Sequence, residues 1–97
     1  MNPLLTIDDR HPAMIAERIS SKYRVPAWVL LPSTFKTHRS HIHWAMRREW
    51  VKQIRGSLSG SKANRAQQIC DLTGYNKKEL YTITDRYNKI KHLLRED

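Results

Sequence analysis

The sequence predicts a single all-α domain of about four helices, on the basis of three observations. Apolar residues recur at steps of three and four over long stretches, and this spacing places them on one side of a helix. Residues that cap helices, or glycines that end them, stand at the boundaries of those stretches. The chain has 97 residues, 39% of them hydrophobic, which is enough for one modest core and too few for two domains.

The N-terminal part is predicted to contain an arm, a first helix and a connector. The arm covers residues 1–11, and the helix runs from about 12 to 23, because Pro12 suits a first helical position. The apolar residues of this helix recur every four positions, at Ile15, Ile19 and Tyr23. Prolines on both sides of "AWVLL", residues 27–31, predict a short extended or single-turn connector that buries Trp28.

A second helix is predicted from about residue 40 to 57, with Gly56 and Gly60 ending it. Its apolar stripe consists of Ile42, Met46, Trp50, Ile54 and Leu58. Its remaining faces carry Arg47, Arg48, Lys52 and Arg55. The stripe is interpreted as core, and the basic residues as solvent-facing.

Two further helices are predicted in the C-terminal third. The first runs from about 62 to 73, is capped by Ser61, and buries Ile69, Cys70 and Leu72. The second begins at Lys77, because Asn76 is a preferred N-cap and Glu79 follows three residues later. The stripe of this last helix comprises Leu80, Ile83, Tyr87, Ile90 and Leu94.

The stretch "AQQICDLTGYNKKELYTI", residues 66–83, has the features of a helix-turn-helix. Cys70 is a small residue where two helices would cross, and Gly74 suits a turn with a positive φ. A shared core is predicted from Ile69, Tyr75, Leu80 and Ile83. The spacing resembles the helix-turn-helix of many bacterial and phage regulators, and Thr-Gly-Tyr before basic residues is similar to some transposase DNA-binding regions. The helix-turn-helix region is taken as 61–94.

A longer pattern resembles the adhesin-biosynthesis regulators that control fimbrial operons in enteric bacteria. It combines "VLLPS" at 29–33, "LSG" at 58–60, and Ile69-Cys70 before the turn. This chain has a longer stretch between that glycine and Ile69, and a shorter segment before the preceding helix. The resemblance implies an all-helical protein that oligomerises along AT-rich DNA.

The charge distribution favours a polyanionic partner. The formal net charge is +9, and residues 36–65 carry eight basic side chains against one acidic residue, Glu49. The sequence therefore predicts a transcription regulator that binds double-stranded DNA. Base edges would be read by Asn76, Lys77, Lys78, Tyr81, Thr82 and Asp85, and phosphates would meet Arg47, Arg48, Lys52, Arg55, Lys62 and Arg65.

The alternative from another class is a small basic modulator, for example phage-encoded, that acts on an acidic protein surface. RNA binding is less favoured, because the sequence lacks a stacking platform on a sheet. A zinc site from His38, His41 and His43 with Cys70 or His92 lacks the usual second ligand pair. Neither Cys70 nor Glu17 and Glu49 suggests catalysis, so no enzyme activity, cofactor, metal or small-molecule substrate is predicted.

The remaining expectations concern location and assembly. A single cysteine, the absence of a secretory signal pattern and the absence of a long apolar run favour the bacterial cytoplasm and exclude a membrane span. A homodimer or larger assembly is predicted, since helix-turn-helix proteins commonly pair two readers. Its interface is predicted from the N-terminal segment, at Leu4, Leu5, Ile7, Ile15, Ile19 and Trp28.

Overall fold

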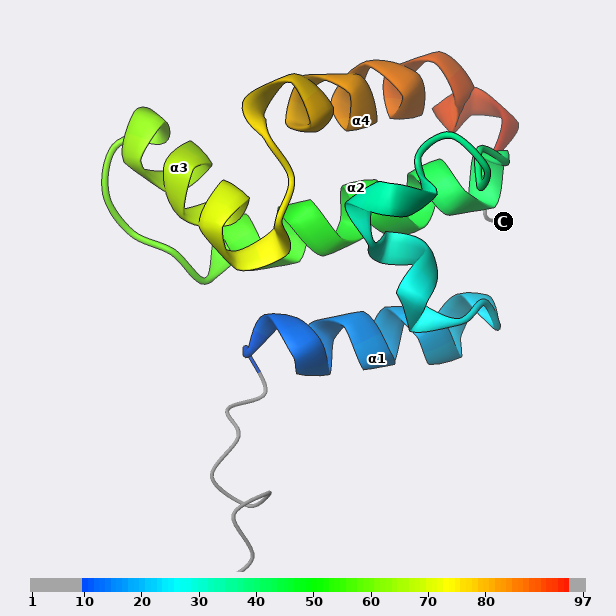
Figure 1. Cartoon of the computed structure of the whole chain (residues 1–97), viewed down its shortest axis with the longest axis horizontal. Helices are drawn as coiled ribbons and strands as arrows, with labels where there is room; N and C mark the ends of the chain where they lie inside the picture. The colour runs from blue at the N-terminus through cyan, green and yellow to red at the C-terminus, as the bar shows by residue number, and fades with distance from the viewer. Residues whose placement is uncertain (1–9, 95–97) are drawn as a thin grey trace, which may run out of the picture.

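The computed structural model describes residues 10–94, and within that range the chain is helical with no strand (Figure 1). Its four α-helices are α1 (Pro12–Tyr23), α2 (His41–Gly56), α3 (Lys62–Thr73) and α4 (Lys77–Ile90). Short 3₁₀ turns are η2 (Ala27–Leu30), η3 (Pro32–Thr34) and η4 (Lys91–Leu93). The predicted all-α class is confirmed. None of the helices in this part of the chain has the length and apolar character needed to cross a membrane.

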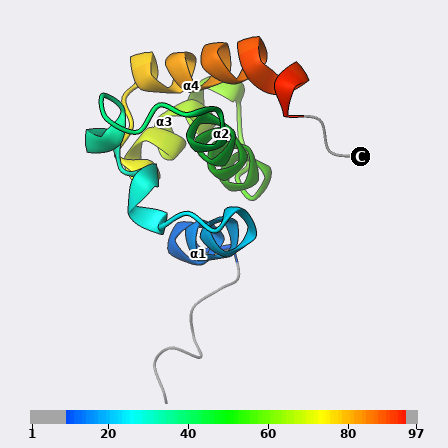
Figure 2. The ribbon, with the colours of Figure 1, turned by 90° about the vertical axis from the view of Figure 1, so that its right-hand side faces the viewer.

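Helix α2 lies in the middle of the molecule, with α1 on one side of it and α4 on the opposite side (Figures 1 and 2). Helix α3 packs near the C-terminal end of α2 and also contacts α4. The η2 and η3 turns run past α2 between the end of α1 and the start of α2. Because α2 contacts each of the other α-helices, most of the core residues pack around α2.

The buried core combines residues from all four helices and from η2. Its larger members are Ile15, Ile19, Leu30, Trp44, Met46, Trp50, Val51, Ile54, Ile69, Tyr75, Leu80 and Ile83. The predicted shared core of the last two helices, which consisted of Ile69, Tyr75, Leu80 and Ile83, is confirmed. Along the rest of the α4 stripe, Tyr87, Ile90 and Leu94 are half-buried.

Side-chain caps fix where the helices begin. Ser40 Oγ accepts a hydrogen bond from the His43 amide at the start of α2. At the start of α4, Asn76 Oδ1 accepts from the Glu79 amide at 2.7 Å, and Glu79 Oε1 accepts from the Asn76 amide at 2.9 Å. This reciprocal arrangement satisfies two backbone donors that a helix end leaves unpaired, and it confirms the predicted cap.

Three residues that were predicted to be buried are exposed. Trp28 is 51% exposed, because η2 turns only Val29 and Leu30 inward and leaves the Trp28 ring against His38. Ile42 lies in the first turn of α2, beyond the covered part of that helix, and is 44% exposed. Leu72 is exposed because α3 turns Ile69 and Thr73 inward, and Cys70 is only partly buried.

The predicted oligomer interface also needs correction. Ile15 and Ile19 belong to the core of the protein itself, so they are not free to pack against a second copy. Trp28 is exposed, as an interface residue would be in a single chain. Leu4, Leu5 and Ile7, like nearly all of the predicted arm, lie outside the described residues.

Tyr75 ties the segment between α3 and α4 to η2. Its side chain is buried, its hydroxyl donates a hydrogen bond to the Leu30 carbonyl, and its ring contacts those of Phe35 and Trp50. Burial is the main cause that raises the pKa of the Tyr75 hydroxyl above its ordinary value of about 10.

This raised pKa predicts a loss of stability at alkaline pH. Above about pH 10 the unfolded chain releases the Tyr75 proton while the folded chain keeps it, so the free energy of unfolding falls as the pH rises. Tyr75→Phe is expected to make this fall shallower, while costing about 1 kcal/mol at neutral pH through the lost hydrogen bond. Urea unfolding across the alkaline range measures both effects. Equal slopes for wild type and Tyr75→Phe would contradict the assignment.

Candidate nucleic-acid interface

A three-residue connection, residues 74–76, joins α3 to α4. Gly74 has φ 84°, in the left-handed region, and its amide donates to the Cys70 carbonyl at 2.9 Å, which ends α3. A Cβ added at Gly74 would lie 3.5 Å from the Pro32 ring, so the connection passes close to η3. The positive φ predicted for Gly74 is confirmed, and together with the Asn76 cap it sets the direction in which α4 leaves α3.

Helix α4 has one face against α2 and an opposite face that points outward. Leu80 and Ile83 are buried on the inner face. The outer face carries Lys78 and Tyr81, which are exposed, and Tyr81 is 72% exposed. Lys77 is also exposed at the start of the helix. The sequence predicted this polar face correctly, because the steps between its residues place them opposite the apolar stripe.

Intramolecular hydrogen bonds already occupy part of this outer face. The Thr82 hydroxyl donates to the Lys78 carbonyl at 3.0 Å, and Asp85 forms an ion pair with Lys89 at 3.2 Å. Asn76 uses its side-chain oxygen in the helix cap. In residues 10–94 no such bond engages the side chains of Lys78 and Tyr81, which keep their full donor and acceptor capacity.

Lys89 was missed by the sequence reasoning, although a signal for it existed. It stands four residues after Asp85, and opposite charges at that spacing on a helix commonly pair. Because the Asp85 carboxylate already pairs with Lys89, the amino group of a DNA base would have to compete with Lys89 for this carboxylate.

Basic side chains from α2 and α3 gather without acidic partners. Burial lowers the pKa of Arg55, and the positive charges of Arg48 and Arg65 lower it further. Among the described residues, neither ion pair involves these three arginines, and Arg48 Nη1 and Arg65 Nε are buried without an acceptor. Lys62 is exposed in the first turn of α3. Like charges that lie close together favour a bound anion.

Arg47 does not belong to the phosphate-contacting set, and that prediction is wrong. The residue is 0% exposed, and its guanidinium lies 4.6 Å from the centre of the Phe35 ring and 4.4 Å from that of Trp44. Nη2 donates to Thr34 Oγ1 at 2.8 Å and to the Val29 carbonyl at 3.3 Å. Arg47 therefore joins α2 to the η2 and η3 turns, where no phosphate can reach it.

The sequence contained a signal for this burial. Val51 and Ile54 follow Arg47 by four and seven positions and are both buried, so Arg47 lies on the inner face of α2. The prediction that Arg47 contacts phosphate rests on its charge, whereas its position on the helix indicates burial.

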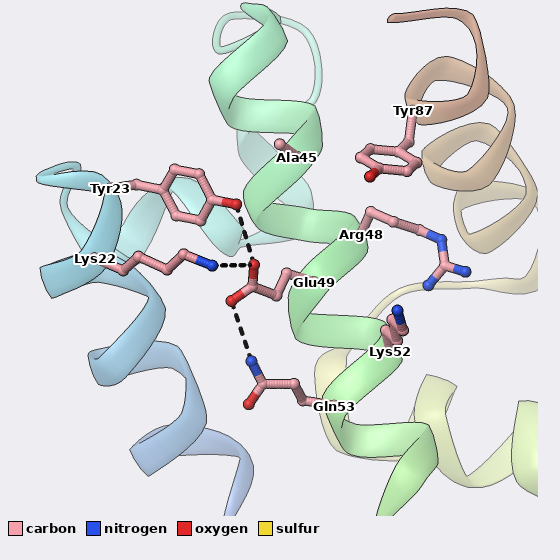
Figure 3. A pocket seen from close by; sticks show the side chains of 8 residues that line it. All are labelled: Lys22, Tyr23, Ala45, Arg48, Glu49, Lys52, Gln53 and Tyr87. Carbon is pink, nitrogen blue, oxygen red and sulfur yellow. Dashed lines mark hydrogen bonds and ion pairs between the residues drawn. The ribbon is translucent and has the colours of Figure 1, made fainter. Parts of the chain in front are cut away.

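Arg48 and Lys52 face a groove that runs between α1, α2 and α4 (Figure 3). Helix α2 forms the floor, α1 contributes Lys22 and Tyr23, and α4 contributes Tyr87. The groove has a volume of about 520 Å³. Tyr87 had been assigned to the apolar stripe alone, and its position beside a cavity was not predicted.

The histidines and the cysteine have structural surroundings. His43 Nδ1 accepts from the Ser40 amide in the α2 cap, and burial is the main cause that lowers the pKa of its ring. The His38 ring contacts those of Trp28 and His43. Within residues 10–94, no three side chains are grouped as a metal site would require. Burial is also the main cause that raises the pKa of the Cys70 thiol, which lowers its reactivity.

In the comparisons with known proteins, no protein-family model, curated sequence or solved structure matched the chain.

Proposed function

We propose that the protein binds double-stranded DNA, with α3 and α4 acting as a helix-turn-helix and α4 as the reading helix, and that it regulates transcription. The observation that carries this proposal is the outer face of α4. This face presents Lys78 and the 72% exposed Tyr81 next to a fixed three-residue connection. A rigid helix with an uncovered face of hydrogen-bonding groups suits the major groove, which admits one α-helix.

The outer face supports different roles for its residues. Lys78 and Tyr81 are the main candidates for base contacts, because no hydrogen bond or ion pair within residues 10–94 engages their side chains. Lys77, at the first position of α4, can contact either a base edge or a nearby phosphate. Thr82, Asp85 and the remaining amide group of Asn76 are secondary candidates, since each already makes an intramolecular hydrogen bond or ion pair.

Phosphate contacts are proposed for Arg55, Lys62 and Arg65. Arg55 and Arg65 belong to the cationic group without acidic partners. Lys62 is exposed and lies on α3 three residues before Arg65. Arg48 and Lys52 are not assigned to DNA here, because they face the groove between α1 and α4.

Substitutions in the two sets are expected to have different effects on DNA binding. Lys78→Ala and Tyr81→Ala should weaken binding to a duplex selected from a random pool by about 1–3 kcal/mol each and should spare an unselected duplex. Lys62→Ala should weaken both duplexes alike and reduce the slope of log affinity against log salt by about 1. Fluorescence anisotropy at several salt concentrations measures both affinity and slope.

Lys36→Ala is the matched control, since Lys36 is an exposed lysine outside α3 and α4 and should change neither duplex by much. Equal losses from Lys78→Ala and Lys36→Ala would reject α4 as the reading helix. A protein that binds no duplex even at low salt would favour the alternative, in which its basic surface meets an acidic protein.

A further inference from the structure

The groove between α1, α2 and α4 contains a carboxylate whose hydrogen bonds are already made. Glu49 Oε1 accepts from Lys22 Nζ at 3.0 Å and from the Tyr23 hydroxyl at 3.1 Å. Glu49 Oε2 accepts from Gln53 Nε2 at 3.1 Å. This arrangement occupies the wall beside α1, so Glu49 is not placed to neutralise the cations on the other side of the groove (Figure 3).

The side of the groove near α4 presents donors without acceptors. Arg48 and Lys52 lie one turn apart on α2, and the Tyr87 hydroxyl points into the same space from α4 (Figure 3). No hydrogen bond or ion pair among residues 10–94 engages these three side chains, and Arg48 Nη1 is buried without an acceptor. Lys52 is exposed and Tyr87 is half-buried, and beside them the buried Arg48 Nη1 favours a ligand that accepts hydrogen bonds and carries negative charge.

The shape of the groove adds a second requirement. At about 520 Å³ it lies in the size range of small-molecule sites, and it is much larger than one inorganic anion requires. The rings of Tyr23 and Tyr87 stand on opposite sides, and the largely buried Ala45 lies on the floor between them. These surfaces suit an apolar or planar body attached to the anionic group.

We infer that this groove binds a small molecule in which a phosphate monoester is joined to a planar apolar body. A phosphate monoester has three terminal oxygens and about two negative charges, which match the guanidinium, the ammonium and the phenol better than a carboxylate does. The body lies between the two tyrosine rings. The inference does not rest on DNA binding, because it uses neither the outer face of α4 nor Lys62, and of the cationic group it uses Arg48 alone.

Titration of ¹⁵N-labelled full-length protein with phenyl phosphate tests this site, with inorganic phosphate and phenol as partial probes. We expect saturable shifts of amide signals around Ala45, Glu49 and Tyr87 at millimolar phenyl phosphate, weaker binding of phosphate and no binding of phenol. Lys52→Gln should weaken phenyl phosphate about tenfold, as loss of one charged hydrogen bond does, and Tyr87→Phe should weaken it a few-fold. Lys78→Gln, which removes the same charge outside the groove, should change nothing.

The outcomes separate a built site from general attraction. Equal losses from Lys52→Gln and Lys78→Gln, or shifts that do not saturate, would overturn the proposal. A duplex DNA arm identifies the source of the phosphate. If duplex DNA displaces phenyl phosphate and Lys52→Gln weakens both, the groove holds a DNA phosphate and the small-ligand proposal falls. If the duplex binds without displacing phenyl phosphate, or does not bind at all, the site stands apart from DNA binding.

Discussion

Replacing Ile83 with alanine is expected to lower the free energy of unfolding by about 2–5 kcal/mol. Ile83 is 0% exposed on the face of α4 that packs against α2, and the substitution removes apolar contacts and leaves a cavity. Since a domain of this size has only about 5–15 kcal/mol of stability, a large share of the protein should unfold at moderately raised temperature. Urea unfolding followed by circular dichroism measures the loss.

Ile42→Ala provides the matched control for that experiment. It makes the same chemical change in a helix, but Ile42 is 44% exposed, so the expected loss is below about 1 kcal/mol. Losses of equal size at the two positions would show that α4 is not packed on α2 as described.

Two substitutions of Arg47 are expected to separate the contribution of its charge to stability from that of its volume. Arg47→Met keeps much of the volume between Phe35 and Trp44 and removes a buried charge whose Nε and Nη1 have no acceptor in the described part of the chain. We expect the free energy of unfolding of Arg47→Met to be equal to the wild-type value, or higher by about 1 kcal/mol or more. Apolar replacement of buried charged groups often has this effect. Arg47→Ala leaves the space empty and should cost about 2–4 kcal/mol.

The polar partners of Arg47 do not reverse this expectation. The single proton of the Thr34 hydroxyl is placed between the carbonyls of Val29 and Leu31, so this hydrogen bond remains in the turn when the guanidinium is gone. Thermal and urea unfolding of both variants give the comparison. A loss for Arg47→Met as large as that for Arg47→Ala would show that the guanidinium itself, rather than its volume, stabilises the turn.

The helices could be predicted closely from the sequence because local chemistry decides where they begin and end. Pro12, the Asn76 and Glu79 cap, and Gly74 each act on the backbone within a few residues of themselves. The predicted starts of the four helices and the predicted ends of the first three therefore agree with the structure to within about one residue, which is also the usual uncertainty of such boundaries. The last helix is predicted to continue to Leu94, but α4 ends at Ile90 and the η4 turn follows it.

Burial was harder to predict, because it depends on which neighbour covers a residue. Ile42 continues the stripe of α2 by its spacing, yet nothing in the described fold covers the first turn of that helix. Trp28 has the most apolar surface in its segment, but the tight η2 turn can point only some of its four residues inward. Arg47 shows the opposite error, since the ring of Phe35 after η3 and that of Trp44 on α2 itself surround a charge that the sequence alone assigns to solvent.

The two candidate sites also differ in how far the sequence predicts them. The outer face of α4 follows from periodicity within one helix, so its residues were predicted together. The groove joins Tyr23, Arg48 and Tyr87 from three helices, and no local pattern relates these positions. Only the packing of α1 and α4 on α2 brings them to one place.

The hydrogen bond from Tyr75 to Leu30 has a consequence for protein engineering. It links positions 45 residues apart, and the same two segments also pass close to each other at Gly74, where an added Cβ would lie 3.5 Å from the Pro32 ring. Residues 61–94 therefore do not form a unit that can be transferred to another protein by itself. Moved to another scaffold without residues 27–35, they would expose the Tyr75 ring to water and lose the hydrogen bond to Leu30, so any transplant or chimaera has to carry both segments as one unit.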